Sequence, residues 1–246
     1  MTWTAAEAAA FLAGPFWHGA LVFLRVSALV SVLPAFGERT VPMRVKLAVA
    51  VMFTLVVAPA VLPVAPGPDV ETVVRFALTE TATGLMLGLA IRLYVLALQT
   101  AGSMAAQATS LAQILGGAAA EPIPAMGYVL VVGGLALAVM SGLHVHVARL
   151  LILSYDLFPA GEFIAGGRLA GWGVDRVAQA FSLAFALAAP FVIASVIYNL
   201  TLGVINRAMP QLMVAFVGSP VITFGGPALL MVAGPYMLML WRDELM

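Results

Sequence analysis

Five long stretches of the chain contain no Asp, Glu, Lys or Arg, and the charged residues are gathered between them. They contain 22, 28, 27, 30 and 34 residues and run Leu47–Pro68, Leu93–Ala120, Pro122–Ala148, Val177–Asn206 and Ala208–Trp241. A helix needs about 20 mostly apolar residues to cross a hydrocarbon core of about 30 Å. Lipid offers no hydrogen-bond partner, so a spanning segment must satisfy its own backbone groups as a helix. The pattern predicts an all-α polytopic membrane protein.

The hydrophobic positions form six blocks, which we expect to pack as helical hairpins in one domain over residues 1–246. The blocks are about Phe16–Leu33, Val45–Leu62, Val73–Gln99, Met126–Leu153, Val177–Ile205 and Leu212–Leu240. The last block contains Pro220, Pro227 and Pro235. Proline inside a helix removes a hydrogen bond and clashes with the preceding turn. We therefore expect the sixth block to be two short helices or a hairpin.

The basic residues give an orientation. Loop Gly37–Lys46 carries Arg39, Arg44 and Lys46 against the single acid Glu38. The positive-inside rule places such a loop in the cytoplasm and the N-terminus outside. Met1–Pro15 contains no Lys or Arg. The basic region of a cleavable signal peptide is therefore missing, and we expect the first block to be retained as a helix.

Composition excludes several functional classes. Charged residues form 9% of the chain, against about 25% in soluble domains, and the mean hydropathy is +1.09. A net charge of zero gives no reason to expect a nucleic-acid partner, and the absence of Cys excludes disulfides and thiolate chemistry. His144 and His146 lie about 200° apart on a helix, which does not suit one metal ion. We expect no enzyme activity, metal or cofactor.

Two arginines lie inside apolar blocks. Arg25 is in the first block and Arg92 in the third. An unpaired charge at such a depth costs a few kcal/mol, so each arginine should face protein or water. Glu38 and Glu80 are candidate partners, and the sequence does not assign them. A structural ion pair and a contact with a functional pathway both remain open.

Small residues recur at a spacing of four, as in Gly84 and Gly88 and again in Gly134, Ala138 and Gly142. Such stripes let helix backbones approach closely. They fit general packing within the bundle, or a specific contact with another subunit.

Segment Gln99–Pro124 is polar and rich in small residues although it is almost uncharged. Irregular backbone at membrane depth is tolerated where it is buried in protein or lines an aqueous space. A loop that projects into a central cavity fits this pattern, and a solvent-exposed connector is the alternative. As a seal, the loop would use the apolar Leu111, Ile114 and Leu115 with neighbouring Met104, and Gly116 and Gly117 as a hinge.

Several landmarks occur in an order that resembles one family. Arg25 precedes Leu33-Pro34-Ala35-Phe36-Gly37, and Asp156-Leu157-Phe158-Pro159-Ala160-Gly161 follows later. The most specific block is Leu202-Gly203-Val204-Ile205-Asn206-Arg207-Ala208-Met209-Pro210-Gln211. From about Phe16 to Leu240 the chain resembles the FliR family of the flagellar type III protein export gate. The SctT family of injectisomes is the nearest relative with which it can be confused.

The resemblance implies a function and a set of partners. Members of this family form a helical gate with FliP-like and FliQ-like subunits, through which unfolded flagellar substrates enter the export path. It implies FlhB-like and FlhA-like neighbours, contact with membrane lipid, and a place in the bacterial inner membrane at the flagellar basal body. The loop at residues 107–124 falls where the family has its pore plug, but it lacks an aromatic residue and has Glu121 before Pro122 where Asp is usual. The alternatives are an injectisome gate subunit and a small-molecule transporter or channel.

The residues before Pro210 suggest a role in assembly. Pro210 should end the preceding helix, and the Arg207 guanidinium can then bridge carbonyl groups left free at that helix end. We expect Arg25, Arg92, Arg207, Pro210 and Gln211 to support the structure or its assembly.

Overall fold

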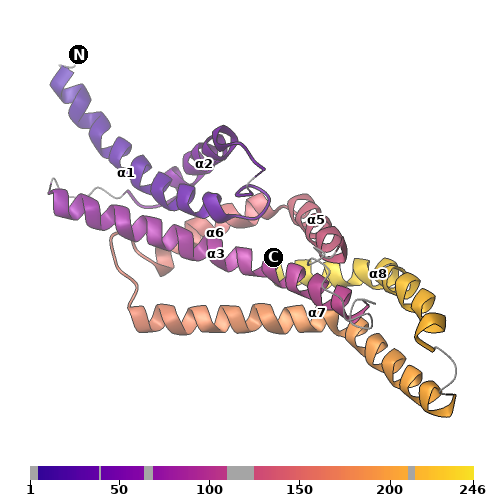
Figure 1. Cartoon of the computed structure of the whole chain (residues 1–246). Helices are drawn as coiled ribbons and strands as arrows, with labels where there is room; N and C mark the ends of the chain where they lie inside the picture. The colour runs from indigo at the N-terminus through magenta and orange to yellow at the C-terminus, as the bar shows by residue number, and fades with distance from the viewer. Residues whose placement is uncertain (1–4, 39, 64–68, 110–124, 210–213) are drawn as a thin grey trace. The chain divides into compact units, whose positions relative to one another are not determined.

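The computed structural model describes the chain except for residues 1–4, 39, 64–68, 110–124 and 210–213, and it also leaves out the side chains of residues 5–13, 125 and 214–223. All regular structure in the described part is helical (Figure 1). The elements are α1 (Ala5–Val32), α2 (Met43–Val57), η1 (Ala58–Ala60), α3 (Val70–Ala108), α5 (Ala125–Met140), α6 (Leu143–Leu157), α7 (Gly166–Ala208) and α8 (Val214–Leu245).

The helices have the length and composition of membrane spans. Five stretches of the described residues are long and apolar enough to cross a bilayer, and the number rises to six if the bent pair α5 and α6 counts as one span. The most apolar window lies in α7, with a mean hydropathy of 2.3. The all-α membrane class predicted from the uncharged stretches is thus confirmed.

Two of the six predicted blocks have a different form. The fourth block forms two helices, because the helical structure is interrupted at Ser141 and Gly142 between α5 and α6. Gly142 has a φ of +88°, a left-handed conformation that other residues adopt only at a cost. Gly142 therefore ends the stripe that begins at Gly134 and does not belong to a packing face.

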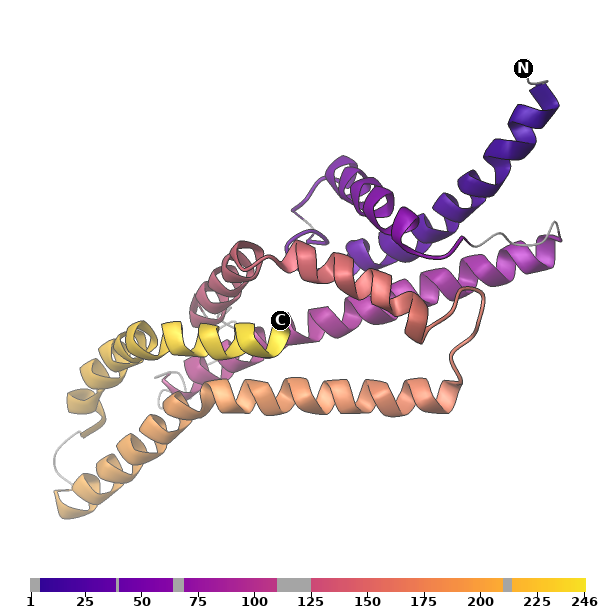
Figure 2. The same ribbon diagram turned by 180° about the vertical axis from the view of Figure 1, so that it is seen from behind.

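The sixth block is one helix, so the expectation of two short helices or a hairpin was wrong. Helix α8 runs from Val214 to Leu245 through all three prolines, and Figures 1 and 2 show it curved and uninterrupted. A proline removes one hydrogen bond and bends a helix, but the other bonds of the ladder persist. In apolar surroundings a full break would leave more backbone groups without partners.

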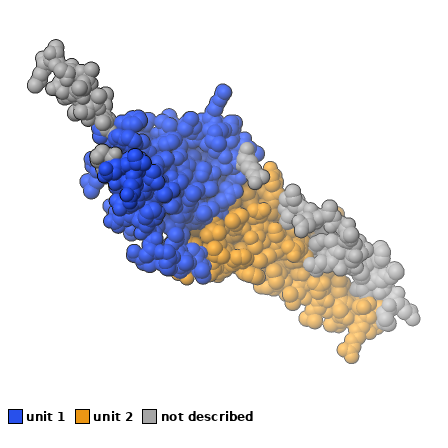
Figure 3. Space-filling view, turned by 60° about the vertical axis from the view of Figure 1, so that its left-hand side comes forward, with its two compact units in different colours: residues 1–92, 141–174 blue, residues 93–140, 175–246 orange. Residues whose placement is uncertain are grey.

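The chain forms two compact units, each assembled from separate segments (Figure 3). Unit 1 contains residues 1–92 and 141–174, and unit 2 contains residues 93–140 and 175–246. Helices α3 and α7 each contribute to both units. The single domain expected over the whole chain stays a prediction.

Unit 1 is held together by close contact between α1 and α3. A Cβ atom added at Gly84 would overlap the carbonyl oxygen of Arg25, and one added at Gly88 would overlap the side chain of Val32. The GxxxG pair thus packs directly on the backbone of α1, as small-residue stripes do in membrane bundles. Helix α2 packs on α1 and α6.

Unit 2 has a similar close approach in its own core. A Cβ atom at Gly102 of α3 would overlap the backbone of Gly127 in α5, and one at Gly134 would overlap the side chain of Leu98. The Trp241 side chain from α8 is fully buried and its indole N–H donates to the carbonyl oxygen of Tyr94 at 2.7 Å. The hydrogen bond satisfies the one polar atom of this large apolar side chain.

Candidate functional site: a buried arginine cluster

Arg25 lies in the core of unit 1, where a charge is expensive to bury. Its relative exposure is 0%. The apolar residues Val22, Val26 and Leu29, which are near it in α1, are buried as well. Removing a charge from water costs several kcal/mol unless its hydrogen bonds are replaced. The environment of Arg25 must therefore supply both an opposite charge and several acceptors.

The opposite charge is Glu80 of α3. The Arg25 Nε donates to Glu80 Oε2 at 2.8 Å and its Nη2 donates to Glu80 Oε1 at 3.0 Å. Both side chains are almost completely buried, with 1% and 0% exposure. This two-point geometry matches the planar fork of the guanidinium to the carboxylate, and it is the strongest form of an ion pair between side chains.

Helix α6 and the residue after it supply the remaining acceptors. The Arg25 Nη1 donates to the hydroxyl of Ser154 at 2.9 Å, and its Nη2 donates to the carbonyl oxygen of Phe158 at 2.9 Å. Phe158 directly follows the last residue of α6. The guanidinium therefore ties together α1, α3 and the C-terminal end of α6.

Tyr155 closes the cluster from its remaining side. Its ring centroid lies 3.7 Å from the central guanidinium carbon of Arg25, and its hydroxyl donates to Glu80 Oε2 at 3.1 Å. The aromatic face adds a cation–π contact that is strongest when water is excluded. Arg25, Glu80, Ser154 and Tyr155, with the Phe158 carbonyl, are hereafter the Arg25 cluster.

The sequence identified only part of this cluster. Arg25 and Glu80 stand out because they are charges in apolar blocks, and of the two candidate acids the structure pairs Arg25 with Glu80. Ser154 and Tyr155 were missed, since an uncharged serine or tyrosine does not stand out in an apolar helix. Their position just before the Asp156–Gly161 motif is the only signal that points to them. The complete burial favours a structural ion pair over contact with an aqueous pathway.

Arg92 forms an ion pair with the second candidate acid, Glu38. Its Nη1 lies 3.6 Å from Glu38 Oε1 and donates to the carbonyl oxygen of Val32 at 3.3 Å, at the last residue of α1. The two side chains are about one third exposed, at 36% and 32%. A partly exposed pair of this kind contributes about 0–1 kcal/mol. Arg92 thus supports the end of α1, and the loss of its ion pair costs much less stability than breaking the buried pair of Arg25.

The remaining predicted site residues lie in unit 2 or outside the described residues. Met104 is half-buried on α3, and Arg207 is exposed in the last turn of α7. Helix α7 ends at Ala208, two residues before Pro210, as the restriction that proline places on the residue before it predicts. Outside the described residues lie Leu111, Ile114, Leu115, Gly116, Gly117, Pro210 and Gln211. The plug and assembly roles of these residues stay predictions.

The Arg25 cluster has the features of a positioning element and not of a catalytic centre. Every carboxylate oxygen of Glu80 is engaged and the guanidinium uses all three of its nitrogens. Within the described ranges no group of three His, Asp or Glu side chains is placed to hold a metal ion. The arrangement can fix the crossing of α1, α3 and α6, and this is the role that its geometry supports.

Comparison with known proteins gives the family. The model of bacterial export proteins, family 1, matches residues 16–246. The chain is 34% identical to the flagellar biosynthetic protein FliR of Caulobacter vibrioides over 92% of this chain and 91% of that protein. It is 31% identical to FliR of Escherichia coli over 83% and 78%, and 28% identical to FliR of Bacillus subtilis over 81% and 79%.

The family match covers the Arg25 cluster and most of both compact units, and it agrees with the membrane-type helices. The relatives are named flagellar biosynthetic or export proteins, and none of these names describes an enzyme. The resemblance drawn from the sequence motifs is confirmed. The chain is a membrane protein of the flagellar export apparatus and belongs to the FliR family of bacterial export proteins.

Proposed function

We propose that this chain is a subunit of the gate through which unfolded flagellar proteins enter the type III export path. FliP-like and FliQ-like subunits complete the pore, and FlhB-like and FlhA-like proteins adjoin it. The assembly lies in the bacterial inner membrane at the flagellar basal body. The family membership supports an export role, and the dimensions of the helices support an assembly with other proteins.

Helix α7 gives the main support for an assembly with other proteins, because it is both too long and too apolar for a simple membrane crossing. It contains 43 residues, which correspond to about 65 Å at 1.5 Å per residue, although Pro190 lies within it. Its longest uncharged stretch has 30 residues and would span about 45 Å. A hydrocarbon core of about 30 Å leaves part of this apolar length outside lipid.

The side chains of α7 make the same point. Only 22% of its most apolar window is buried in this chain, and Phe181, Phe185, Ile193 and Ile197 are more than half exposed. Apolar surface beyond the reach of lipid needs a protein partner, since water would meet it otherwise. Helix α3, with 39 residues, has a similar excess of length. Helices of partner subunits that pack along α7 would cover this apolar surface, and the proposed gate assembly provides such helices.

The other functional classes have weaker support. A helix broken at the prolines of the sixth block would favour a transporter, because broken helices often form substrate sites in transporters. Helix α8 is continuous in the structure, and that reason for a transporter is removed. An injectisome gate subunit would have the same role in protein export, but the relatives described above carry flagellar names.

The gate assignment predicts a defined complex. When the chain is produced with FliP-like and FliQ-like proteins of the same organism, we expect it to co-purify with them in detergent at one copy per complex. The mass of the intact complex, measured by native mass spectrometry, gives the copy number. The matched control is the chain produced alone, which should be poorly dispersed because α7 is uncovered. A stable homo-oligomer that ignores both partners would contradict the proposal.

The loop at residues 107–124, most of which lies outside the described residues, is proposed to seal the resting pore. Replacing Leu111, Ile114 and Leu115 by serine removes the apolar side chains that would pack in the constriction, because a dry seal depends on them. We expect such a gate to assemble and to leak small ions, measured as membrane conductance or as solute-induced growth arrest. The matched control replaces Ala118, Ala119 and Ala120 by serine. If both triple variants seal like the natural gate, the loop is a connector and the plug assignment fails.

A further inference from the structure

An apolar groove runs between α2 and α6 in unit 1. It has a volume of about 540 Å³ and its lining includes Phe36, Met52, Phe53, Val56, His144 and Val145. Met52 and Val56 are 70% and 58% exposed, so the groove opens to the outside of the unit. This is the α2–α6 groove, and the Arg25 cluster uses none of its lining residues.

One wall of the groove continues into a basic segment. Lys46 precedes Val49, another lining residue, by three positions and Phe53 by seven, which places it on the same face of α2. The Lys46 ammonium donates to the carbonyl oxygen of Gly37 at 2.8 Å, so the loop that carries Phe36 lies against this end of α2. Arg44 is exposed two positions before Lys46, on another side of α2, and no hydrogen bond or ion pair engages it among the described residues.

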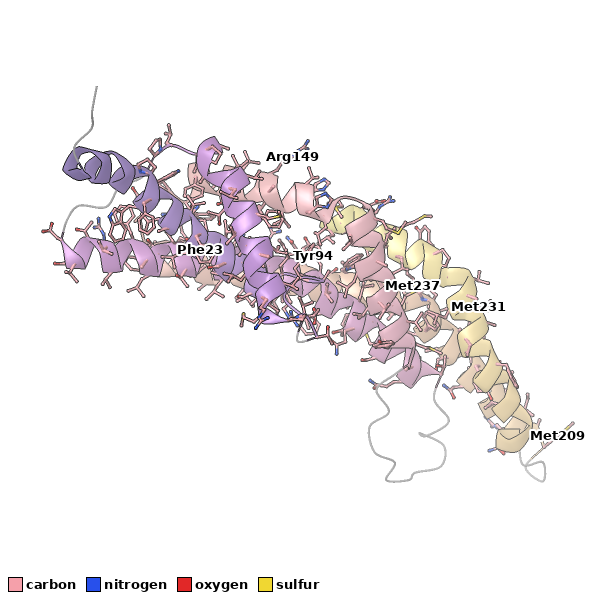
Figure 4. All side chains as sticks on the ribbon, turned by 90° about the horizontal axis from the view of Figure 1, so that it is seen from above. Phe23, Tyr94, Arg149, Met209, Met231 and Met237 are labelled. Atoms are coloured by element: carbon pink, nitrogen blue, oxygen red, sulfur yellow. The ribbon has the colours of Figure 1, made fainter. Side chains whose placement is uncertain are left out.

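The other wall is basic as well. On α6, His144 lines the groove, and exposed Arg149 follows the lining residue Ala148 directly and Val145 by one helical turn. The Arg149 side chain projects outward from α6 (Figure 4). It has no ion-pair partner in the described part of the chain. The acid nearest to these residues in the loop, Glu38, is already paired with Arg92.

The position of the groove in the chain sets its depth in a membrane. Helices α1 and α2 are both candidate spans, so the loop at residues 33–42 that joins them lies at one membrane face. An apolar groove that begins at such a face, and is bordered by cations without an acidic partner among the described residues, fits an amphiphile with an anionic head. Basic pockets between membrane helices bind anionic phospholipid headgroups in this way.

We propose that the α2–α6 groove binds an anionic phospholipid, with an acyl chain along Met52, Phe53 and Val145 and the headgroup phosphate near Lys46 and Arg149. The uncompensated positive charge on both walls selects against zwitterionic lipids. A purely apolar partner helix would leave these cations without counter-charges. The site is independent of the gate assignment, because it rests on unit 1 alone.

The test is lipid retention by the full chain, purified in detergent with its partners, stripped of lipid and titrated with phosphatidylglycerol or phosphatidylcholine. Native mass spectrometry counts the bound lipids. We expect phosphatidylglycerol to bind at least tenfold more tightly than phosphatidylcholine. The double variant Lys46→Gln/Arg149→Gln should weaken phosphatidylglycerol binding about 25-fold, or about fivefold for each charge removed. Glutamine at position 46 keeps a donor for the Gly37 carbonyl.

Two further variants separate headgroup recognition from general effects. Met52→Trp keeps every charge but fills the groove, and it should reduce retention of phosphatidylglycerol by at least tenfold. Arg75→Gln/Arg168→Gln removes two exposed charges of unit 1 away from the groove and should bind phosphatidylglycerol like the natural chain. Equal affinity for the two lipids, or unchanged binding in Lys46→Gln/Arg149→Gln, would overturn the proposal. Capture of a protein in place of lipid by a photo-crosslinker at position 52 would overturn it as well.

Discussion

Replacement of Arg25 by methionine is expected to destabilise unit 1 by about 3–5 kcal/mol, the usual cost of removing one partner from a buried ion pair. Methionine fills a similar volume, so the loss is electrostatic and not a cavity effect. The Glu80 carboxylate would stay buried without its counter-charge, and Ser154 and the Phe158 carbonyl would lose a donor. The measurement is thermal unfolding of the full chain in detergent, together with its level in membranes.

The matched control is Arg92→Met, which removes an arginine from another apolar helix, α3. Because its pair with Glu38 is partly exposed, the loss should be within about 1 kcal/mol. A second variant, Arg25→Met/Glu80→Met, should be more stable than Arg25→Met alone, since replacing a whole buried pair by apolar groups is often nearly neutral. If Arg25→Met and Arg92→Met lower stability equally, the cluster does not organise the unit.

Replacement of Gly84 by alanine is expected to cost about 3 kcal/mol, the upper end of the range for overpacking. The new methyl group would overlap the carbonyl oxygen of Arg25, a backbone atom that has no rotamer through which to escape. Helix α1 must then move away from α3, and the distances of the Arg25 cluster change with it. Thermal unfolding and limited proteolysis of the α1–α3 contact report this loss.

Gly203 supplies the comparison for Gly84. It lies inside α7 and an added Cβ there meets nothing within 4 Å. Gly203→Ala should therefore leave stability unchanged or raise it by up to about 1 kcal/mol, because alanine favours the helix. Gly84 and Arg25 share one helix crossing, so the combined variant Gly84→Ala/Arg25→Met should lose less than the sum of the two single losses. Equal behaviour of Gly84→Ala and Gly203→Ala would mean that the crossing tolerates extra volume.

The helical class and the membrane character follow from local sequence. Five uncharged stretches exceed the length of a bilayer crossing, and backbone groups in lipid leave no alternative to a helix. Helix formation in these stretches requires no tertiary contact, and the candidate spans of the structure agree with the prediction. The family resemblance has a similar basis, since the order of motifs along the chain carried it.

The effects of individual prolines and glycines on the helices were harder to predict from the sequence. Three prolines predicted a break in the sixth block, yet α8 continues through them, because the cost of a lost hydrogen bond competes with the cost of opening the whole turn. Gly142 looked like part of a packing stripe, yet it adopts a left-handed conformation between two helices. Its backbone angle depends on where α5 and α6 must end, which periodicity does not encode.

What the sequence determined by itself was that Arg25 needs an acid and further acceptors, because an unpaired charge is too costly in apolar surroundings. Only the tertiary structure chose Glu80 over Glu38, since the two partners lie 55 residues apart in the chain. It also brought Ser154, Tyr155 and the Phe158 carbonyl to the guanidinium from more than 120 residues away. Hydrophobicity and helix geometry act over a few residues and are legible in sequence. The pairing of distant side chains depends on how closely α1 and α3 approach, and the packed glycines decide that.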